Sequence, residues 1–147
     1  MNHHLLRRGL LLAGATGAAA WLAGCSIPVS LPGVGRAPDH PASRDYRQVA
    51  ARHLYQRNAG RIYQGRMPPM LYAIGVLQVD IDRSGNVIRT HWLRAPNHAP
   101  EVVAEIERTV RRAAPFPSPG GTVTYTDTWL WDKSGRFQLD TLTEGQF

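Results

Sequence analysis

Apolar and polar positions alternate strictly at residues 77–81, near the middle of the chain. The apolar positions of this run are Leu77, Val79 and Ile81, and the polar ones are Gln78 and Asp80. This period of two is typical of a strand with one buried face. Residues 82–85 then form a tight connection in which Asp82 caps the turn and Gly85 takes a left-handed conformation. Residues 87–93 are therefore predicted to be the return strand of a hairpin.

The hydrophobic period changes to that of a helix at Pro100, a residue type that suits the first helical position. The predicted buried stripe comprises Val103, Ile106 and Val110, with Val102 and Ala113 beside it. Pro115 and Pro117 stop the helix. Strand, turn, strand and amphipathic helix form the framework of the fold, with the helix face packed against the first strand.

A second helical stripe precedes this framework. Ser43 is predicted to cap the helix, and the stripe consists of Tyr46, Val49, Ala50 and Leu54. We expect the helix to end near residues 58–60, where Gly60 closes it.

A second hairpin is predicted after the central helix. Residues 122–131 have the composition of a strand, and one parity holds Val123, Tyr125, Trp129 and Trp131. Residues 132–135 repeat the chemistry of the first turn, and residues 136–142 are the expected fourth strand. One face of that strand would hold Phe137, Leu139 and Thr141.

The N-terminus is typical of an export signal. Arg7 and Arg8 precede an apolar run at residues 9–22, which is too short for a comfortable membrane span. The run ends in Leu22-Ala23-Gly24-Cys25, which resembles the lipobox of bacterial lipoproteins. That resemblance implies cleavage before Cys25 and attachment of a diacylglycerol and a further acyl chain, palmitate for example, to this residue. An ordinary signal peptide with an incidental cysteine is the alternative, and the choice between Sec and twin-arginine export stays open.

The predicted domain boundaries follow from this signal. Residues 1–24 are the signal peptide, residues 25–42 are the lipidated cysteine and a Pro/Gly-rich linker, and residues 43–147 are the folded domain. Several acyl chains would anchor the protein stably to a membrane. Ser26 stands where an inner-membrane retention signal would have aspartate, so we expect the periplasmic face of the outer membrane.

Charge and chemistry-bearing residues indicate neither nucleic-acid binding nor catalysis. The net charge of +6 comes almost wholly from arginine, without the basic and aromatic interleaving of a nucleic-acid surface. The histidines lack the spacing of a metal pair, and turn or strand-edge roles explain Asp80 and Asp82 better than acid–base catalysis. The expectations are no enzyme, no cofactor and no metal.

The tryptophans leave one alternative function open. Trp92, Trp129 and Trp131 could form an aromatic row that stacks on a glycan or a lipid, although core packing is the commoner use of tryptophan. Exposure of Trp129 and Trp131 distinguishes a glycan- or lipid-binding structural lipoprotein from a protein-binding one.

Residues 61–131 resemble the C-terminal periplasmic domain of TonB and its relative TolA. The resemblance rests on the hairpin GVLQVDIDRSGNVIRTHWLRAP, on the helix end RTVRRAAPFPSP and on the strand that follows. It implies an α+β fold, with a helix packed on one face of a small antiparallel sheet. It also implies an envelope module that binds an unidentified protein partner without catalysis.

Two departures from that family shape the expectations. A lipobox and a short linker replace the inner-membrane helix and long spacer of a TonB-type transducer, so we expect no energy transduction. The family leaves the strand after the helix at a sheet edge, where a partner's segment can add. Here the second hairpin predicts a fourth strand on that edge and a sheet order of 2-1-3-4.

Overall fold

The alternating segment at residues 77–81 lies inside a four-stranded antiparallel sheet with the strand order β2-β1-β3-β4. The computed structural model describes residues 40–143 of the 147-residue chain. The predicted α+β class and the predicted strand order are both confirmed. Cys25, the signal peptide and most of the linker lie outside the described residues.

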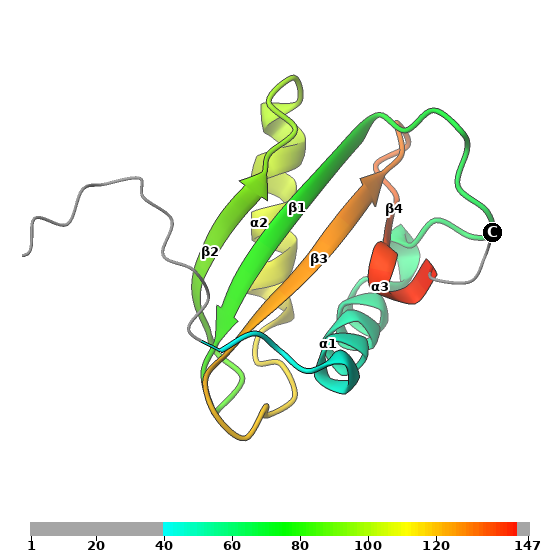
Figure 1. Ribbon diagram of the computed structural model, residues 1–147. Helices are drawn as coiled ribbons and strands as arrows, with labels where there is room; N and C mark the ends of the chain where they lie inside the picture. The colour runs from blue at the N-terminus through cyan, green and yellow to red at the C-terminus, as the bar shows by residue number, and fades with distance from the viewer. Residues whose placement is uncertain (1–39, 144–147) are drawn as a thin grey trace, which may run out of the picture. The chain divides into compact units, whose positions relative to one another are not determined.

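Eight elements follow one another along the described chain. They are α1 (Arg44–Arg57), the 3-10 turn η1 (Ala59–Arg61), β1 (Ala73–Ile81), β2 (Val87–Arg94), α2 (Pro100–Ala113), β3 (Val123–Trp131), β4 (Phe137–Leu139) and α3 (Asp140–Thr143). Figure 1 shows β1 and β3 as the long central strands, with β2 at one edge of the sheet.

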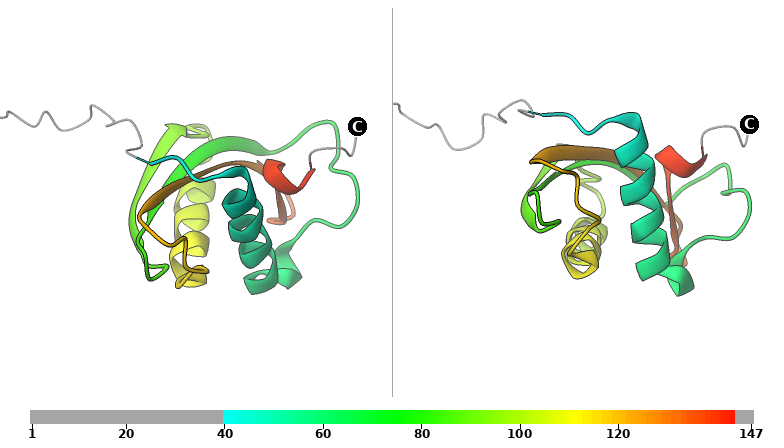
Figure 2. Two further views of the ribbon diagram at one scale, coloured as in Figure 1. Left: turned by 60° about the horizontal axis from the view of Figure 1, so that its bottom comes forward. Right: turned by 90° about the horizontal axis from the view of Figure 1, so that it is seen from below.

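The two long helices cover the same face of the sheet. Figure 2 shows α1 and α2 side by side beneath the strands. The core between these layers includes Leu77, Val79 and Ile81, as the alternation predicts, together with Ile106 and Val110 of α2. The opposite face of the sheet carries the other parity of the strands.

The buried stripe of α2 differs slightly from the predicted one. Val102 is buried and Val103 only half-buried, and Thr109 joins the core beside Val110. Burial of Thr109 is possible because its hydroxyl accepts a 3.0 Å hydrogen bond from Nη1 of Arg61. A polar residue therefore sits within the helix face that periodicity assigns to apolar residues alone.

The predictions for α1 hold for its start and for the position of its end, and they fail for Val49 at its centre and for the role given to Gly60. Ser43 caps the helix, accepting a 3.1 Å hydrogen bond from the backbone N–H of Tyr46. Val49, expected in the core, is 39% exposed, whereas Ala51 is fully buried beside Ala50 and Leu54. Two adjacent alanines therefore occupy the buried face of the helix, and Val49 lies outside it.

The end of α1 depends on Asn58 rather than on Gly60. The Asn58 side chain donates a 2.9 Å hydrogen bond to the carbonyl of Leu54 and so satisfies one of the last helical carbonyls. Gly60 lies in the following 3-10 turn and does not have a positive φ.

The fourth strand is shorter than predicted. β4 ends at Leu139, and Thr141, expected on a strand face, belongs to α3. Oδ1 of Asp127 accepts a 3.1 Å hydrogen bond from the backbone N–H of Thr141, in the first turn of α3. A side chain of the neighbouring strand therefore satisfies a backbone group at the start of α3.

The two D-x-S-G turns adopt the predicted conformation. Gly85 and Gly135 have φ values of 89° and 81°. They differ in their surroundings, because the carbonyl of Gly85 accepts a 2.8 Å hydrogen bond from the N–H of Phe116. The first turn is thus packed against the end of α2, whereas a Cβ at Gly135 would meet nothing within 4 Å.

Candidate functional site

The only sequence-predicted site residue, Cys25, lies outside residues 40–143, so its lipidation stays a prediction. Within the described residues, no group of three or more histidine, cysteine, aspartate or glutamate side chains could hold a metal ion. In the same part of the chain, no helix is both long enough and apolar enough to span a membrane.

The polar residues considered for chemistry have structural contacts. Asp80 binds Arg89 across the hairpin and accepts a 2.6 Å hydrogen bond from the hydroxyl of Thr124. The imidazoles of His53 and His98 lie 2.7 and 2.8 Å from backbone carbonyls. Asp82 accepts hydrogen bonds from Ser84 and Asn86 inside its turn, and those from Asn86 chiefly hold its pKa below the ordinary value.

The tryptophans considered for glycan binding are mostly core residues. Trp129 and Trp131 are 1% and 5% exposed, and the ring of Phe137 stacks on Trp131 at a centroid distance of 5.6 Å. Trp92 is half-buried, and its indole N–H donates a 2.8 Å hydrogen bond to Glu107. Trp129 and Trp131 are therefore unavailable for stacking on a sugar.

A buried acid that the sequence analysis did not single out is Asp127 of β3. Its carboxylate accepts hydrogen bonds from the hydroxyl of Tyr125 at 2.6 Å and from the N–H of Thr128 at 2.9 Å. Desolvation by burial raises the pKa of Asp127, and it also raises the pKa of Tyr125. The signal was present in the sequence, because Asp127 shares the parity of Tyr125 and Trp129.

Three different groups close the outer edge of β3. Near its start, the backbone of Thr124 exchanges hydrogen bonds of 2.7 and 2.9 Å with His40 and Ala42. In the middle, the Asp127 carboxylate accepts a hydrogen bond from the N–H of Thr128. At its end, β4 pairs with residues 129–131. This edge is therefore largely occupied by the chain itself.

Strand β2 forms the opposite edge of the sheet and pairs only with β1 among the described residues. The backbone of Thr124 points away from β1, and antiparallel pairing alternates along each strand. It follows from the register that the N–H and C=O groups of His91 point toward β1. Those of Thr90 and Trp92 point outward from the sheet.

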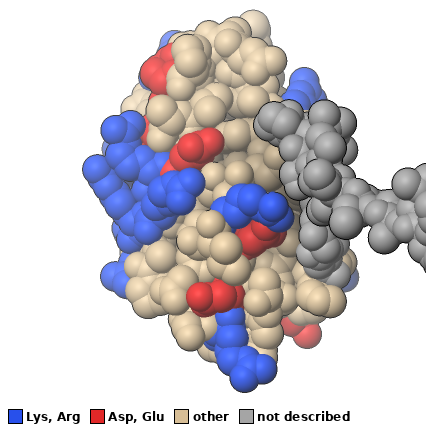
Figure 3. Space-filling model, turned by 90° about the vertical axis from the view of Figure 1, so that its left-hand side faces the viewer, with Lys and Arg blue, Asp and Glu red and all other residues tan. Residues whose placement is uncertain are grey.

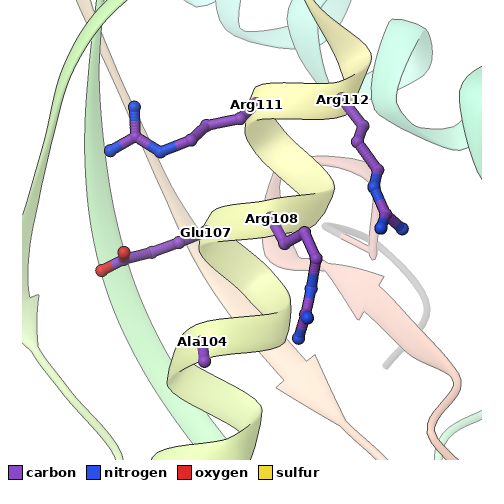
Figure 4. A pocket seen from close by; sticks show the side chains of 5 residues that line it. All are labelled: Ala104, Glu107, Arg108, Arg111 and Arg112. Carbon is purple, nitrogen blue, oxygen red and sulfur yellow. The ribbon is translucent and has the colours of Figure 1, made fainter.

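The side chains of the same two residues contact α2. The hydroxyl of Thr90 accepts a 3.2 Å hydrogen bond from Arg111, and Trp92 binds Glu107 as described above. Figure 4 shows Glu107 and Arg111 reaching toward the strands drawn at the left. The open backbone edge and this flank of α2 therefore adjoin one another.

Arginine dominates the flank of α2. A shallow hollow of about 470 Å³ is lined by Ala104, Glu107, Arg108, Arg111 and Arg112. Figure 3, which views the molecule from the β2 side, shows basic side chains gathered over one part of this surface. Arg108 is paired with Glu105, whereas Arg111 and Arg112 form no ion pair with any residue in the range 40–143.

A second hollow lies at the other end of the sheet, beneath the loop that joins η1 to β1. It measures about 590 Å³, and its lining includes Met67, Pro68, Ile74 and Leu130. Met70 of the same loop is 87% exposed. This surface is less basic than the flank of α2, and none of its lining residues belongs to β2 or α2.

Comparison with known proteins gives no match to a protein-family model, to a curated protein or to a solved structure. The surfaces above are therefore assessed on their own geometry. The β2 edge with its arginine-rich flank is the candidate functional site.

Proposed function

We propose that this protein is a lipoprotein anchored by Cys25 to the periplasmic face of the outer membrane, and that its folded domain binds a protein partner. It does not itself transduce energy between membranes. The observation that carries this proposal is the open β2 edge, where backbone groups that pair with no residue of the described range lie beside cationic side chains. Such an edge is suited to contact with another polypeptide.

The membrane anchor rests on the Leu22-Ala23-Gly24-Cys25 sequence. The resemblance to TonB and TolA domains, made on residues 61–131, supports the assignment to the envelope. The α+β fold agrees with what that resemblance implies, and the lipobox with its short linker is the reason for excluding transduction.

The anchor is tested by labelling cells with a fatty acid. The wild-type protein is expected to carry the label, and Cys25→Ser to lose it and to remain uncleaved or soluble. Label retained in Cys25→Ser would contradict the proposed anchor. Fractionation of inner and outer membranes then tests the location.

Partner binding is tested in cells by introducing a photo-crosslinking amino acid at exposed positions of the full-length protein. Leu93 on β2 and Met70 on the distant loop provide two positions on different surfaces. The proposal expects a discrete crosslinked protein from at least one of them, and mass spectrometry identifies it. Absence of any crosslinked protein from both positions would contradict the proposed partner binding.

A further inference from the structure

Building on the proposed function, we infer that the β2 edge binds an extended, acidic segment of the partner, which adds to the sheet as a further strand beside β2. The inference specifies both the surface and the chemistry of its occupant. It combines three observations: the open backbone groups of β2, the apolar side chains along this edge, and the cations beside it.

The backbone groups provide the pairing site. Thr90 and Trp92 lie in a stretch where the register with β1 is regular, between the two irregularities of the β1–β2 pair. Their outward N–H and C=O groups are spaced as in any strand of an antiparallel sheet. β2 contains no proline and runs from Val87 to Arg94, so an added strand has several residues to pair with.

The exposed side chains of β2 include two large aliphatic ones. Ile88 and Leu93 are each more than half exposed. Neither forms part of the core cluster. An added strand would cover part of both side chains and remove apolar surface from water.

The charges around the edge select an acidic occupant. Side chains of an added strand that project toward the helix layer lie beside Arg111, and those near the end of β2 lie beside Arg94. Neither arginine forms an ion pair with a described residue. Glu107 is the one carboxylate that lines the hollow, and it already accepts the indole N–H of Trp92.

The same charges disfavour a second copy as the occupant. Edge-to-edge pairing of two β2 strands would bring two sets of arginines together, and like charges across an interface oppose association. An anionic membrane would neutralise the arginines but would not pair with the outward N–H and C=O groups as a strand does. The coincidence of strand edge and cations therefore favours an acidic peptide segment.

The probe for the test is a fluorescent peptide of about ten residues in which glutamate alternates with valine or threonine. Its anisotropy is measured with the full-length lipidated protein in detergent micelles. Binding is expected for this peptide and is expected to weaken as salt is added. The same peptide with lysine in place of glutamate is expected not to bind.

Two matched pairs of variants locate the site. Thr90→Pro deletes an outward N–H without removing a hydrogen bond to β1, and proline is tolerated on edge strands. Thr90→Val keeps this N–H and removes the hydroxyl that Arg111 contacts, so it measures the part of any loss that comes from the side chain. Affinity is expected to fall at least about tenfold in Thr90→Pro and Arg111→Glu, and further in Thr90→Pro than in Thr90→Val, while Arg57→Glu remains near wild type. Thermal melts verify folding, and Arg111→Glu decides the result if Thr90→Pro does not fold.

Each contrary result discards the inference. Failure of the acidic peptide to bind, or equal binding by the lysine peptide, excludes an acidic strand. Sedimentation that shows a dimer lost in Thr90→Pro would assign the edge to a second copy. Binding of phosphatidylglycerol vesicles by Thr90→Pro, without peptide binding by the wild type, would assign the cations to a membrane.

The inference and the proposed function fail separately. A partner crosslinked from Met70 but not from Leu93 would preserve the proposed function and discard the β2 edge as its site. Peptide binding without any crosslinked partner in cells would preserve the edge and count against the proposed function.

Discussion

The hydroxyl of Tyr125 donates a 2.6 Å hydrogen bond to Oδ2 of Asp127, two residues further along the same strand. The other carboxylate oxygen accepts N–H groups from Thr128 and from Thr141 in α3. One buried acid therefore satisfies a backbone group at the edge of β3 and starts the last helix. Its burial raises its pKa, which makes this arrangement dependent on pH.

Asp127→Asn tests that dependence. Because the pKa of Asp127 is higher in the folded domain than the ordinary value of 3.8, the folded state binds more protons between these two pKa values. The contribution of Asp127 to the free energy of unfolding is therefore largest below the ordinary pKa and falls as pH rises through the folded pKa. The stability of Asp127→Asn relative to wild type should increase with pH over this interval.

Urea unfolding of both proteins across a pH series measures this difference. The pKa values of Asp82 and Asp132 are lowered in the folded domain, so their contributions to the free energy of unfolding are lost in acid. Both residues are present in both proteins, so these contributions cancel in the comparison. Asp127→Ala is the control: it removes the acceptor of Tyr125, Thr128 and Thr141 and should cost about 1–3 kcal/mol per unpaired group. A stability difference between Asn and Asp that does not vary with pH would contradict the proposed titration.

The two D-x-S-G turns provide a matched pair of glycine substitutions. Gly85→Ala and Gly135→Ala both place a side chain at positive φ, at a cost of about 1–2 kcal/mol. A Cβ at Gly85 would also overlap the carbonyl of Phe116, whereas one at Gly135 meets nothing within 4 Å. Thermal melts should show the larger fall in melting temperature for Gly85→Ala. Equal falls would mean that the first turn moves away from the new side chain without a measurable loss of stability.

The face of α2 is tested by comparing Ile106→Ala with Val103→Ala. Ile106 is 1% exposed, so its truncation should cost about 2–5 kcal/mol. Val103 is half-buried on the same helix and should cost clearly less. Chemical denaturation of the two variants ranks them, and a reversed order would show that the helix is rotated from the described position.

Arg61 links η1 to the aromatic core and to α2. Its guanidinium lies 5.5 Å from the ring centroid of Trp131 and pairs with Glu105 at 3.0 Å. Arg61→Lys keeps the charge but loses the planar guanidinium that stacks on Trp131 and pairs with Glu105. It should lower the free energy of unfolding by about 1 kcal/mol. Arg57→Lys, at the exposed end of α1, is the control and should leave the urea midpoint unchanged. Similar midpoints for both variants would assign no special role to Arg61.

The hydrophobic period and the turn residues predict the strands well, because a strand with one buried face has apolar residues at every second position. Leu77, Val79 and Ile81 illustrate this, as does the hairpin that adds β4 to the sheet. Helix α1 is harder to predict, since Ala51 is buried through close packing rather than through hydrophobic size. Periodicity alone prefers Val49 for that role.

The candidate site was less accessible to sequence reasoning. Whether a strand edge is open depends on what the rest of the chain covers, and the closure of β3 by Asp127 and by residues 40–42 involves contacts remote in sequence. Sequence spacing alone places Glu107 and Arg111 at i and i+4 on a helix, where an ion pair between them is expected. In the fold these two side chains contact Trp92 and Thr90 instead, which places their charge beside the β2 edge.

The attachment of His40 and Ala42 to Thr124 has a mechanical consequence. Within the described residues, a pull transmitted along the chain from its N-terminal side reaches these two hydrogen bonds before it reaches α1 or the core. If they yield, the backbone groups of Thr124 lose their partners while the core residues stay in place. Tension on the N-terminal side would then expose a length of unpaired strand edge without unfolding the domain.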